Sequence, residues 1–165
     1  MKTPAQDPAW FRKVLGSYPT GVCVITATDA DGRPVGLTVG SFTSVSLDPP
    51  LIGFFPDRNS TSWRRIRTVG RFCVNILSAH QEGVCRQLAQ PAEDKFAGLS
   101  HSQAPSGAPI LDDVVGWIDC ALFSEHEVGD HFAVFGQVLD LDLGKDAAPL
   151  IFHQGRYGSV TTTGS

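Results

Sequence analysis

Short β-rich runs separated by turn signals constrain the fold of this chain more than any other feature of its sequence. Residues 22–28, 71–77, 114–128 and 132–143 are rich in β-branched and apolar side chains, which favour strands. Strands and helices do not alternate strictly along the chain, so a doubly wound parallel sheet is not expected. Roughly six such runs, with two or three helices between them, predict a mainly β fold in which helices are attached to a closed barrel.

Helices are expected at three places in the chain. Asp7 followed by Pro8 combines an N-cap carboxylate with proline at the first helical position, which is a typical helix start. A second helix follows a polar loop and runs to about residue 69, and a third spans residues 81–89. The candidate N-caps of the second helix are Asn59, Ser60 and Thr61.

Residues typical of turns separate the remaining predicted elements of the chain. Residues 29–32 predict a hairpin turn with Gly32 at positive φ, and Gly129-Asp130-His131 predicts another between the two longest runs. Residues 94–99 predict a short helical turn that Gly98 closes. Residues 100–109 are polar and contain Pro, Gly and Ser, which predicts a loop.

The size and charge of the chain limit the classes of protein to which it can belong. With 165 residues, of which 42% are hydrophobic, it has the size of one domain with a full core. We expect a single domain over residues 1–160 and a disordered tail over residues 161–165. A net charge of -4 argues against a nucleic-acid partner. No apolar run reaches about 18 residues and the first residues carry no apolar signal segment, so we expect no membrane span and a cytoplasmic protein.

The cysteines and histidines show no metal-binding pattern. The 4 cysteines, at positions 23, 73, 85 and 120, form no CxxC pair. Cys23, Cys73 and Cys120 lie within apolar runs, where they are expected to act as small buried hydrophobes. The 5 histidines form no HExxH or similar arrangement. The sequence therefore predicts no metal site.

Residues 36–55 are unusually rich in hydroxyl groups for a strand region. Serines and threonines alternate there with β-branched residues, while Gly36 and Gly40 would let another group approach the backbone closely. Buried hydroxyls need hydrogen-bond partners, so these side chains either contact a ligand or belong to an edge strand that faces water. The composition of the segment leaves both readings open.

A polar segment before the second helix is a candidate anion site. A helix N-terminus offers free N–H groups and a favourable dipole to a phosphate, and Arg58 lies beside a hydroxyl-rich helix start. The alternative is ordinary helix capping beside a surface arginine. Neither a GxGxxG that follows a strand nor a GxxxxGK[ST] occurs, so a nucleotide bound in the Rossmann or P-loop manner is disfavoured.

Several motifs in collinear order resemble one known family. They include Tyr18-Pro19-Thr20-Gly21-Val22, the segment 36–46 (GLTVGSFTSVS), 71–77 (RFCVNIL), Asp94-Lys95-Phe96-Ala97-Gly98, Gly129-Asp130-His131 and Arg156-Tyr157-Gly158. Together they cover nearly the whole chain. The chain resembles the flavin reductase-like, FMN-binding split-barrel family, and within it the short-chain reductase components of two-component flavin monooxygenases.

The resemblance implies a fold and an activity. The fold would be a Greek-key split β-barrel with attached helices, in a homodimer that binds flavin near the subunit interface. NADH or NADPH would reduce FMN or FAD, and the reduced flavin would diffuse to a partner monooxygenase. The alternative is a flavin-binding sensor or storage protein of the same fold that does not turn over.

The resemblance also implies particular site residues. The segment from Thr38 to Ser41 and the nearby serines would contact the flavin ring and ribityl chain, largely through the backbone, and the segment from Asp57 to Ser62 would contact the phosphate. His131 would place the nicotinamide, although a solvated turn histidine is the plain alternative for this residue. The implied cofactor-binding residues are Thr38, Val39, Gly40, Ser41, Ser44, Ser46, Asp57, Arg58, Asn59, Ser60, Thr61, Ser62, Phe96 and Tyr157.

The absence of an acid–base constellation in the sequence agrees with this chemistry. Hydride transfer between two flat rings needs stacking and alignment more than a protein acid or base. The protein would orient the rings and donate hydrogen bonds where negative charge grows on the flavin. Backbone N–H groups between Thr38 and Ser46 are expected to supply them.

Overall fold

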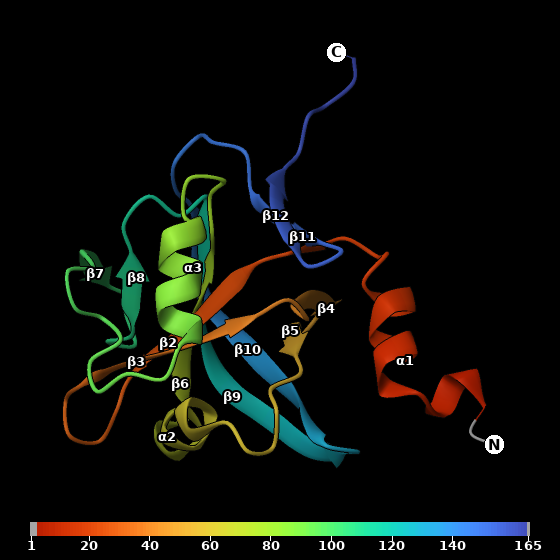
Figure 1. The fold of residues 1–165 in the computed structure, drawn as a ribbon. Helices are drawn as coiled ribbons and strands as arrows, with labels where there is room; N and C mark the ends of the chain where they lie inside the picture. The colour runs from red at the N-terminus through yellow and green to blue at the C-terminus, as the bar shows by residue number, and fades with distance from the viewer. Residues whose placement is uncertain (1–2, 165) are drawn as a thin grey trace.

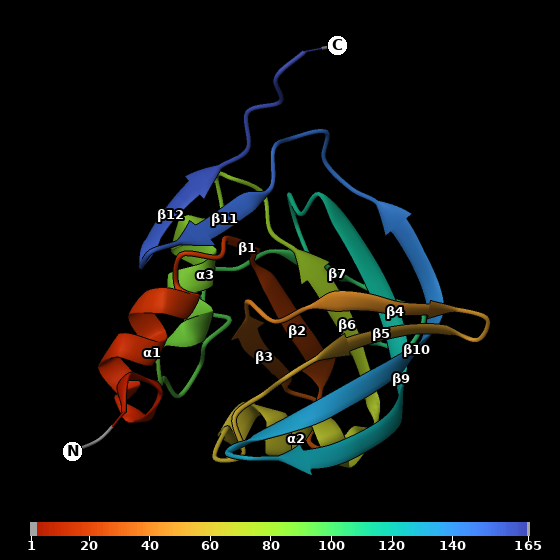
Figure 2. The ribbon, with the colours of Figure 1, turned by 90° about the vertical axis from the view of Figure 1, so that its right-hand side faces the viewer.

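The computed structural model describes residues 3–164 and is built on a curved seven-stranded antiparallel sheet (Figures 1 and 2). The strands follow the order β3-β2-β6-β9-β10-β5-β4. In the described part of the chain the edge strands β3 and β4 do not pair with each other, so the barrel is split rather than closed. The mainly β prediction is confirmed. The strand bounds are β2 (Cys23–Thr28), β3 (Pro34–Val39), β4 (Thr43–Leu47), β5 (Pro50–Phe54), β6 (Arg71–Ile76), β9 (Gly116–Val128) and β10 (His131–Leu143).

Two smaller sheets flank the barrel. β1 (Thr20–Gly21), β11 (Leu150–His153) and β12 (Arg156–Ser159) form a three-stranded sheet. β7 (His101–Gln103) and β8 (Pro109–Leu111) form a hairpin, so the prediction of a plain loop over residues 100–109 was wrong.

Long-range polar contacts explain the β7–β8 hairpin. The buried carboxylate of Asp119 accepts hydrogen bonds from the Ser106 N–H at 2.9 Å and the Ser106 hydroxyl at 2.5 Å. The buried Asn75 side chain accepts a hydrogen bond from the Leu111 N–H at 2.8 Å. Because these partners come from distant strands, they hold a polar hairpin whose own sequence reads as a loop.

The helices begin where the sequence indicated. α1 (Pro8–Leu15) is capped by Asp7, whose carboxylate accepts from the Ala9 and Trp10 N–H groups at 3.0 and 3.4 Å. A short 3₁₀ turn, η1 (Pro4–Gln6), precedes it. α2 (Thr61–Val69) is capped by Ser60, and α3 covers Glu82–Ala89. Of the residues 94–99 predicted to form a helical turn, 95–98 form a turn outside any helix, and Gly98 has the expected positive φ of 75°.

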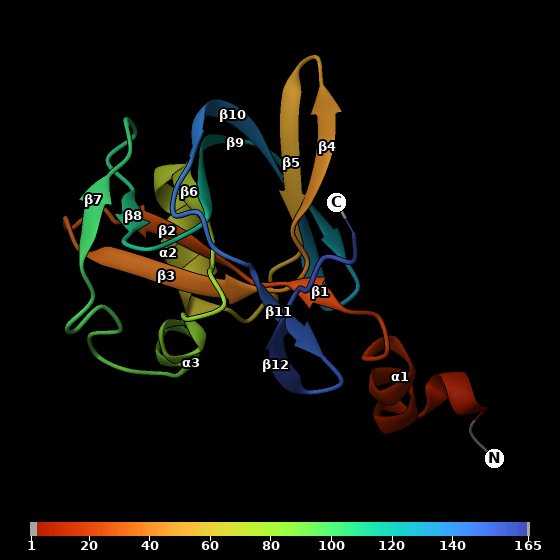
Figure 3. The same ribbon diagram turned by 90° about the horizontal axis from the view of Figure 1, so that it is seen from above.

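α2 packs against the interior of the barrel (Figure 3). Trp63 from α2 is fully buried, with its ring centroid 5.4 Å from that of Phe54, and Phe54 lies 5.5 Å from Phe72 in a second edge-to-face pair. α3 buries Leu88 and Cys85 in a separate apolar cluster outside the barrel. The β3 strand lies between these two clusters and presents one face to each.

All four cysteines are buried and free. Burial raises the pKa of the Cys23 thiol to about 12 and that of Cys73 also to about 12. Burial raises the pKa of Cys120 as well. The interpretation of Cys23, Cys73 and Cys120 as small buried hydrophobes is therefore confirmed.

α1 differs from the other helices because none of its residues is buried. It extends away from the barrel (Figures 1 and 3). Its apolar side chains Trp10, Phe11, Val14 and Leu15 are each about half exposed. Within residues 3–164, no helix combines the length and apolar character needed to cross a bilayer. The predicted tail has no regular structure over residues 161–164, and Ser165 lies outside the described residues.

Candidate functional site

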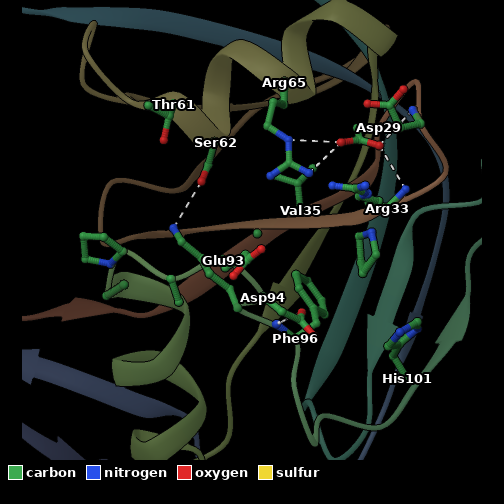
Figure 4. A pocket seen from close by; sticks show the side chains of 17 residues that line it. Asp29, Arg33, Val35, Thr61, Ser62, Arg65, Glu93, Asp94, Phe96 and His101 are labelled. Carbon is green, nitrogen blue, oxygen red and sulfur yellow. Dashed lines mark hydrogen bonds and ion pairs between the residues drawn. The ribbon is translucent and has the colours of Figure 1, made fainter.

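A cavity of about 940 Å³ lies beside the first turn of α2 (Figure 4). β3 forms one wall, and the segment between α3 and β7 forms another. Of the site residues predicted from the sequence, this cavity brings together Thr61, Ser62 and Phe96. Gly36 also lines it, and a side chain there would lie 3.2 Å from the Phe96 ring, so glycine lets β3 approach this ring closely without displacing it.

Lys95 provides a positive charge inside this cavity. Its Nζ donates to the Ser62 hydroxyl at 3.2 Å and to the Leu88 carbonyl at 3.3 Å. No ion pair within residues 3–164 includes Lys95. Burial, followed by the nearby charge of Arg65, lowers the pKa of Lys95. The ammonium group therefore lacks a counter-ion in a partly desolvated position.

The first turn of α2 adds hydrogen-bond donors beside Lys95. The Ser60 hydroxyl accepts from the Trp63 N–H at 3.1 Å and so caps one N–H of this turn. Thr61 and Ser62 are the first helical residues, whose N–H groups have no acceptor within the helix. The helix dipole also favours negative charge at this end. Lys95, the two hydroxyls and the helix terminus together form a setting for a phosphate.

The rest of the cavity lining carries a mixed set of charges. Arg65 pairs with Asp29 through its Nε at 3.0 Å and its Nη2 at 2.5 Å, and this pairing lowers the pKa of Asp29 (Figure 4). The side chain of Arg33 forms no hydrogen bond or ion pair within residues 3–164. His101 from β7 lies edge-on to Phe96, with ring centroids 5.9 Å apart. Arg65 lies on the same helix as Thr61 and Ser62, whereas Asp29, Arg33 and His101 lie farther from these two residues (Figure 4).

A second candidate region is the tip of the β9–β10 hairpin. The turn consists of Gly129 and Asp130, and His131 is already the first residue of β10. Residues 56–58 contact this tip through backbone hydrogen bonds and one isolated β-bridge. The Phe132 N–H donates to the Pro56 carbonyl at 2.9 Å, and Asp57 forms a β-bridge with His131. The backbone thus joins the segment before α2 to the strand that starts with His131.

Side chains strengthen this connection. His131 Nδ1 donates to the Asp130 carboxylate at 2.7 Å, and this hydrogen bond is the main cause of the lowered pKa of Asp130. Arg58 Nη1 donates to the Gly129 carbonyl at 3.3 Å, while Nη2 lies 3.9 Å from a Glu127 carboxylate oxygen. The Asp57 carboxylate accepts from the Asn59 N–H at 2.7 Å. The structure therefore places Arg58 at the hairpin tip and not in the cavity with Ser62.

In the hydroxyl-rich segment, residues 36–55, some of the hydroxyl groups form hydrogen bonds with the protein backbone. The Thr38 hydroxyl donates to the Cys85 carbonyl at 3.3 Å, and the Ser41 hydroxyl accepts from the Phe55 N–H at 2.9 Å. Val39 is buried in the barrel core. Ser44 and Ser46 lie in the edge strand β4, where the register shifts between them. A ligand at Val39 or Gly40 would accordingly meet backbone rather than side chain.

Tyr157 lies away from both regions. The Cys85 thiol donates to its hydroxyl at 3.4 Å, and this contact, with burial, raises the pKa of Tyr157 to about 12. The Arg86 guanidinium lies 4.9 Å from its ring centroid. The structure does not bring Tyr157 to the cavity, although Cys85 contacts both Tyr157 and Thr38.

Sequence reasoning missed Lys95, Arg33 and His101 as cavity residues. Lys95 stands next to Phe96 within a motif that the resemblance had singled out, so its charge was a usable signal. Arg33 and His101 are far from Ser62 in the chain, and only the fold brings them to one cavity. Among residues 3–164, no cluster of His, Cys, Asp and Glu is suited to hold a metal ion.

Comparisons with known proteins give matches over most of the chain. Residues 15–161 match the family described as "Flavin reductase like domain". A flavin reductase from Pseudomonas putida is 54% identical over 154 residues, which are 93% of this chain and 91% of the relative. The reductase subunit HsaB of a flavin-dependent monooxygenase from Rhodococcus jostii is 44% identical over 156 residues, 94% of this chain and 80% of the relative.

A solved structure extends the match to three dimensions. The NADH:FAD oxidoreductase SgcE6 of Streptomyces globisporus, in complex with NAD and FAD fragments, superposes with a TM-score of 0.90 at 31% identity. The alignment covers 98% of this chain and 97% of that one. The likeness of the two folds therefore extends over nearly the whole chain.

Proposed function

The chain belongs to the flavin reductase-like domain family and is an NAD(P)H-dependent flavin reductase, and we propose that it holds the flavin phosphate in the cavity beside α2. The observation that carries this proposal is the Lys95–Ser62 contact at the N-terminus of α2. A phosphate would give the Lys95 ammonium the counter-ion that it lacks, and it would accept hydrogen bonds from the first turn of the helix.

The flavin ring is proposed to lie against the segment from Thr38 to Ser46. β3 leads from the cavity directly to this segment, so a molecule with its phosphate near Ser62 can extend along the strand. The Val39 side chain is buried in the core, and the Ser41 hydroxyl accepts a hydrogen bond from the Phe55 N–H. The backbone would therefore make the ring contacts, and its N–H groups would stabilise negative charge on the ring.

His131 is proposed to position the nicotinamide. When bound, the nicotinamide supplies the hydride and the flavin accepts it. Because Nδ1 of His131 is held by Asp130, Nε2 is left to face a ligand. The segment 56–58 and Arg58 hold the strand that carries His131, so we assign Arg58 to positioning this tip rather than to binding the phosphate.

A flavin-dependent monooxygenase is the partner that receives the reduced flavin.

We further propose a homodimer of single-domain chains, each comprising residues 1–160, in the cytoplasm. The exposed apolar face of α1 supports association, because water-facing apolar surface of this kind commonly marks an interface. Light scattering of the wild type and of a Trp10→Ala, Phe11→Ala double variant tests it. An unchanged dimer in the double variant would remove this argument.

Steady-state turnover tests the function as a whole. The purified chain with free FMN or FAD should oxidise NADH or NADPH over many cycles. The rival function is a flavin-binding sensor or storage protein. It predicts that the flavin binds but neither nicotinamide bleaches it, and that result would overturn the catalytic assignment.

A further inference from the structure

One carboxylate on β9 joins α2 to the hairpin that carries His131. The Glu125 side chain is 12% exposed, and its Oε2 accepts a hydrogen bond from Nε1 of the fully buried Trp63 at 2.8 Å. Its other oxygen, Oε1, lies 2.7 Å from Arg67 Nη2. Trp63 and Arg67 are four residues apart on α2, so they lie on one face of the helix and reach the same carboxylate. Glu125 therefore holds two successive turns of α2 at once.

The Trp63 end of this contact lies beside the proposed phosphate site. Trp63 directly follows Ser62, and its backbone N–H donates to the Ser60 hydroxyl at 3.1 Å. Its ring packs edge-on against Phe54 in the barrel core. Because the core holds the ring and Glu125 holds the indole N–H, the position of the first turn of α2 is fixed.

The Arg67 end reaches the start of β10. The guanidinium carbon of Arg67 lies 5.1 Å from the centroid of the Phe132 ring, which is a cation–π contact. Phe132 is buried and directly follows His131, and its backbone N–H donates to the Pro56 carbonyl at 2.9 Å. A series of side-chain contacts thus leads from the residue after Ser62 to the residue after His131.

We propose that Glu125 is a positioning residue for hydride transfer, which fixes the spacing between the flavin phosphate site at Ser62 and the nicotinamide site at His131. This inference rests on the proposed function, which assigns these ligands to the two sites. Along the chain the sites are joined by an exposed turn at residues 57–59, and Glu125 adds a second connection through a largely buried contact. Hydride transfer depends on the alignment of two rings, so a fixed spacing raises the rate although Glu125 does not line the cavity.

Steady-state kinetics test the proposal in variants that keep the buried hydrogen bond. Glu125→Gln retains an oxygen that can accept from Trp63 Nε1, but it loses the charge that pairs with Arg67. Arg67→Met removes the same pair from the other side. Each should lower nicotinamide kcat/KM by about three- to tenfold, mainly through kcat, and the double variant should lose no more than Arg67→Met alone. Glu82→Gln is the matched control, because Glu82 pairs with Arg86 at 2.8 Å on α3.

A flavin titration without nicotinamide separates this inference from the proposed activity. Glu125→Ala also removes the acceptor of the Trp63 indole N–H, so the preference for FMN over riboflavin should fall by about two- to fivefold, whereas Glu125→Gln should keep it. If Glu125→Ala does not fold, Trp63→Phe removes the same hydrogen bond and should lower the preference likewise. If the wild type oxidises no nicotinamide, the proposed activity fails, and this titration still tests the position of the first turn of α2.

Other results would overturn the proposal. Lower thermal stability of Glu125→Gln and Arg67→Met, with kcat/KM within about twofold of the wild type, would reduce Glu125 to a structural contact. Losses that multiply in the double variant would show that Glu125 and Arg67 act separately. An unchanged preference for FMN in Glu125→Ala and Trp63→Phe, or an equal kinetic loss in Glu82→Gln, would also refute it.

Discussion

The cavity beside α2 and the tip of the β9–β10 hairpin lie at opposite ends of the same short segment, residues 56–62, and they are built differently. The cavity takes its shape from a buried strand, a helix terminus and the half-buried Lys95. The tip takes its shape from backbone pairing of residues 56–58 with residues 130–132, and its side chains are largely exposed. One region is a cavity lined by several elements, whereas the other presents one side chain to an open face.

This difference assigns distinct tasks to the two regions. An enclosed site with an unpaired charge suits a ligand that remains bound while another exchanges. An open turn suits a co-substrate that must enter and leave in every cycle. Substitutions in the cavity should therefore change flavin affinity, and substitutions at the tip should change nicotinamide kinetics. The predictions below test this separation, from the largest expected effect to the smallest.

Lys95→Met should have the largest effect on flavin binding. It removes the charged partner of the phosphate and keeps an apolar stem, so FMN binding should weaken by about 1.5–3 kcal/mol, or about 10- to 150-fold in Kd. Riboflavin has no phosphate and should lose much less. Fluorescence quenching with both ligands measures the difference, and Arg64→Met serves as the control. Equal losses for FMN and riboflavin would place the phosphate elsewhere.

His131→Ala should lower kcat/KM for the nicotinamide by about five- to 150-fold, which corresponds to about 1–3 kcal/mol from one or two lost contacts. Flavin affinity should stay nearly constant, because His131 does not line the cavity. Steady-state kinetics and fluorescence titration measure the two quantities separately. Collapse of flavin binding with normal nicotinamide kinetics would move His131 to the flavin site and abolish the separation.

Arg58→Ala should have a smaller effect at the same tip. The lost contacts with the Gly129 carbonyl and Glu127 are exposed, so nicotinamide kcat/KM should fall by about two- to fivefold. FMN affinity should remain that of the wild type. Arg58→Lys keeps the charge but has one nitrogen in place of the Nη1 and Nη2 pair. Partial recovery of nicotinamide kcat/KM in this variant would support a positioning role for Arg58. A selective loss of FMN over riboflavin in Arg58→Ala would return this arginine to the phosphate site.

A pH titration should give the most gradual effect. The pKa of Lys95 is lowered in the folded chain, so the free protein loses this charge at a lower pH than an ordinary lysine does. The preference for FMN over riboflavin should therefore decline as pH rises through that pKa. Between the folded and unfolded pKa values the unfolded chain binds more protons, so the Lys95 contribution to stability should increase with pH. A preference that does not change with pH in the wild type, or one that still declines in Lys95→Met, would contradict this assignment.

The sequence predicted those parts of the fold that local chemistry decides. Asp7, Ser60 and Gly32 act through neighbours a few residues away, so their caps and turn were visible in the sequence. The β7–β8 hairpin was missed because Asp119 and Asn75, which hold it, are supplied by other strands. A polar strand with distant partners has the same composition as a loop.

The candidate site shows the same limit. Ser62 and Phe96 were predicted through the resemblance, but the contact of Lys95 with Ser62 joins residues 33 positions apart and depends on how α3 packs on β3. Arg58 was expected to face a phosphate because it stands next to a helix start. The structure instead turns its guanidinium toward the hairpin tip, a neighbour that the local sequence does not contain.

The burial of the cysteines has a consequence for the durability of the enzyme. Reduced flavin that escapes its partner reacts with dioxygen and releases hydrogen peroxide close to the chain. Peroxide attacks thiolates, and both the removal of these sulfurs from water and their raised pKa values keep them protonated at neutral pH. The four thiols of the reductase are thus poor targets for the oxidant that an uncoupled cycle generates.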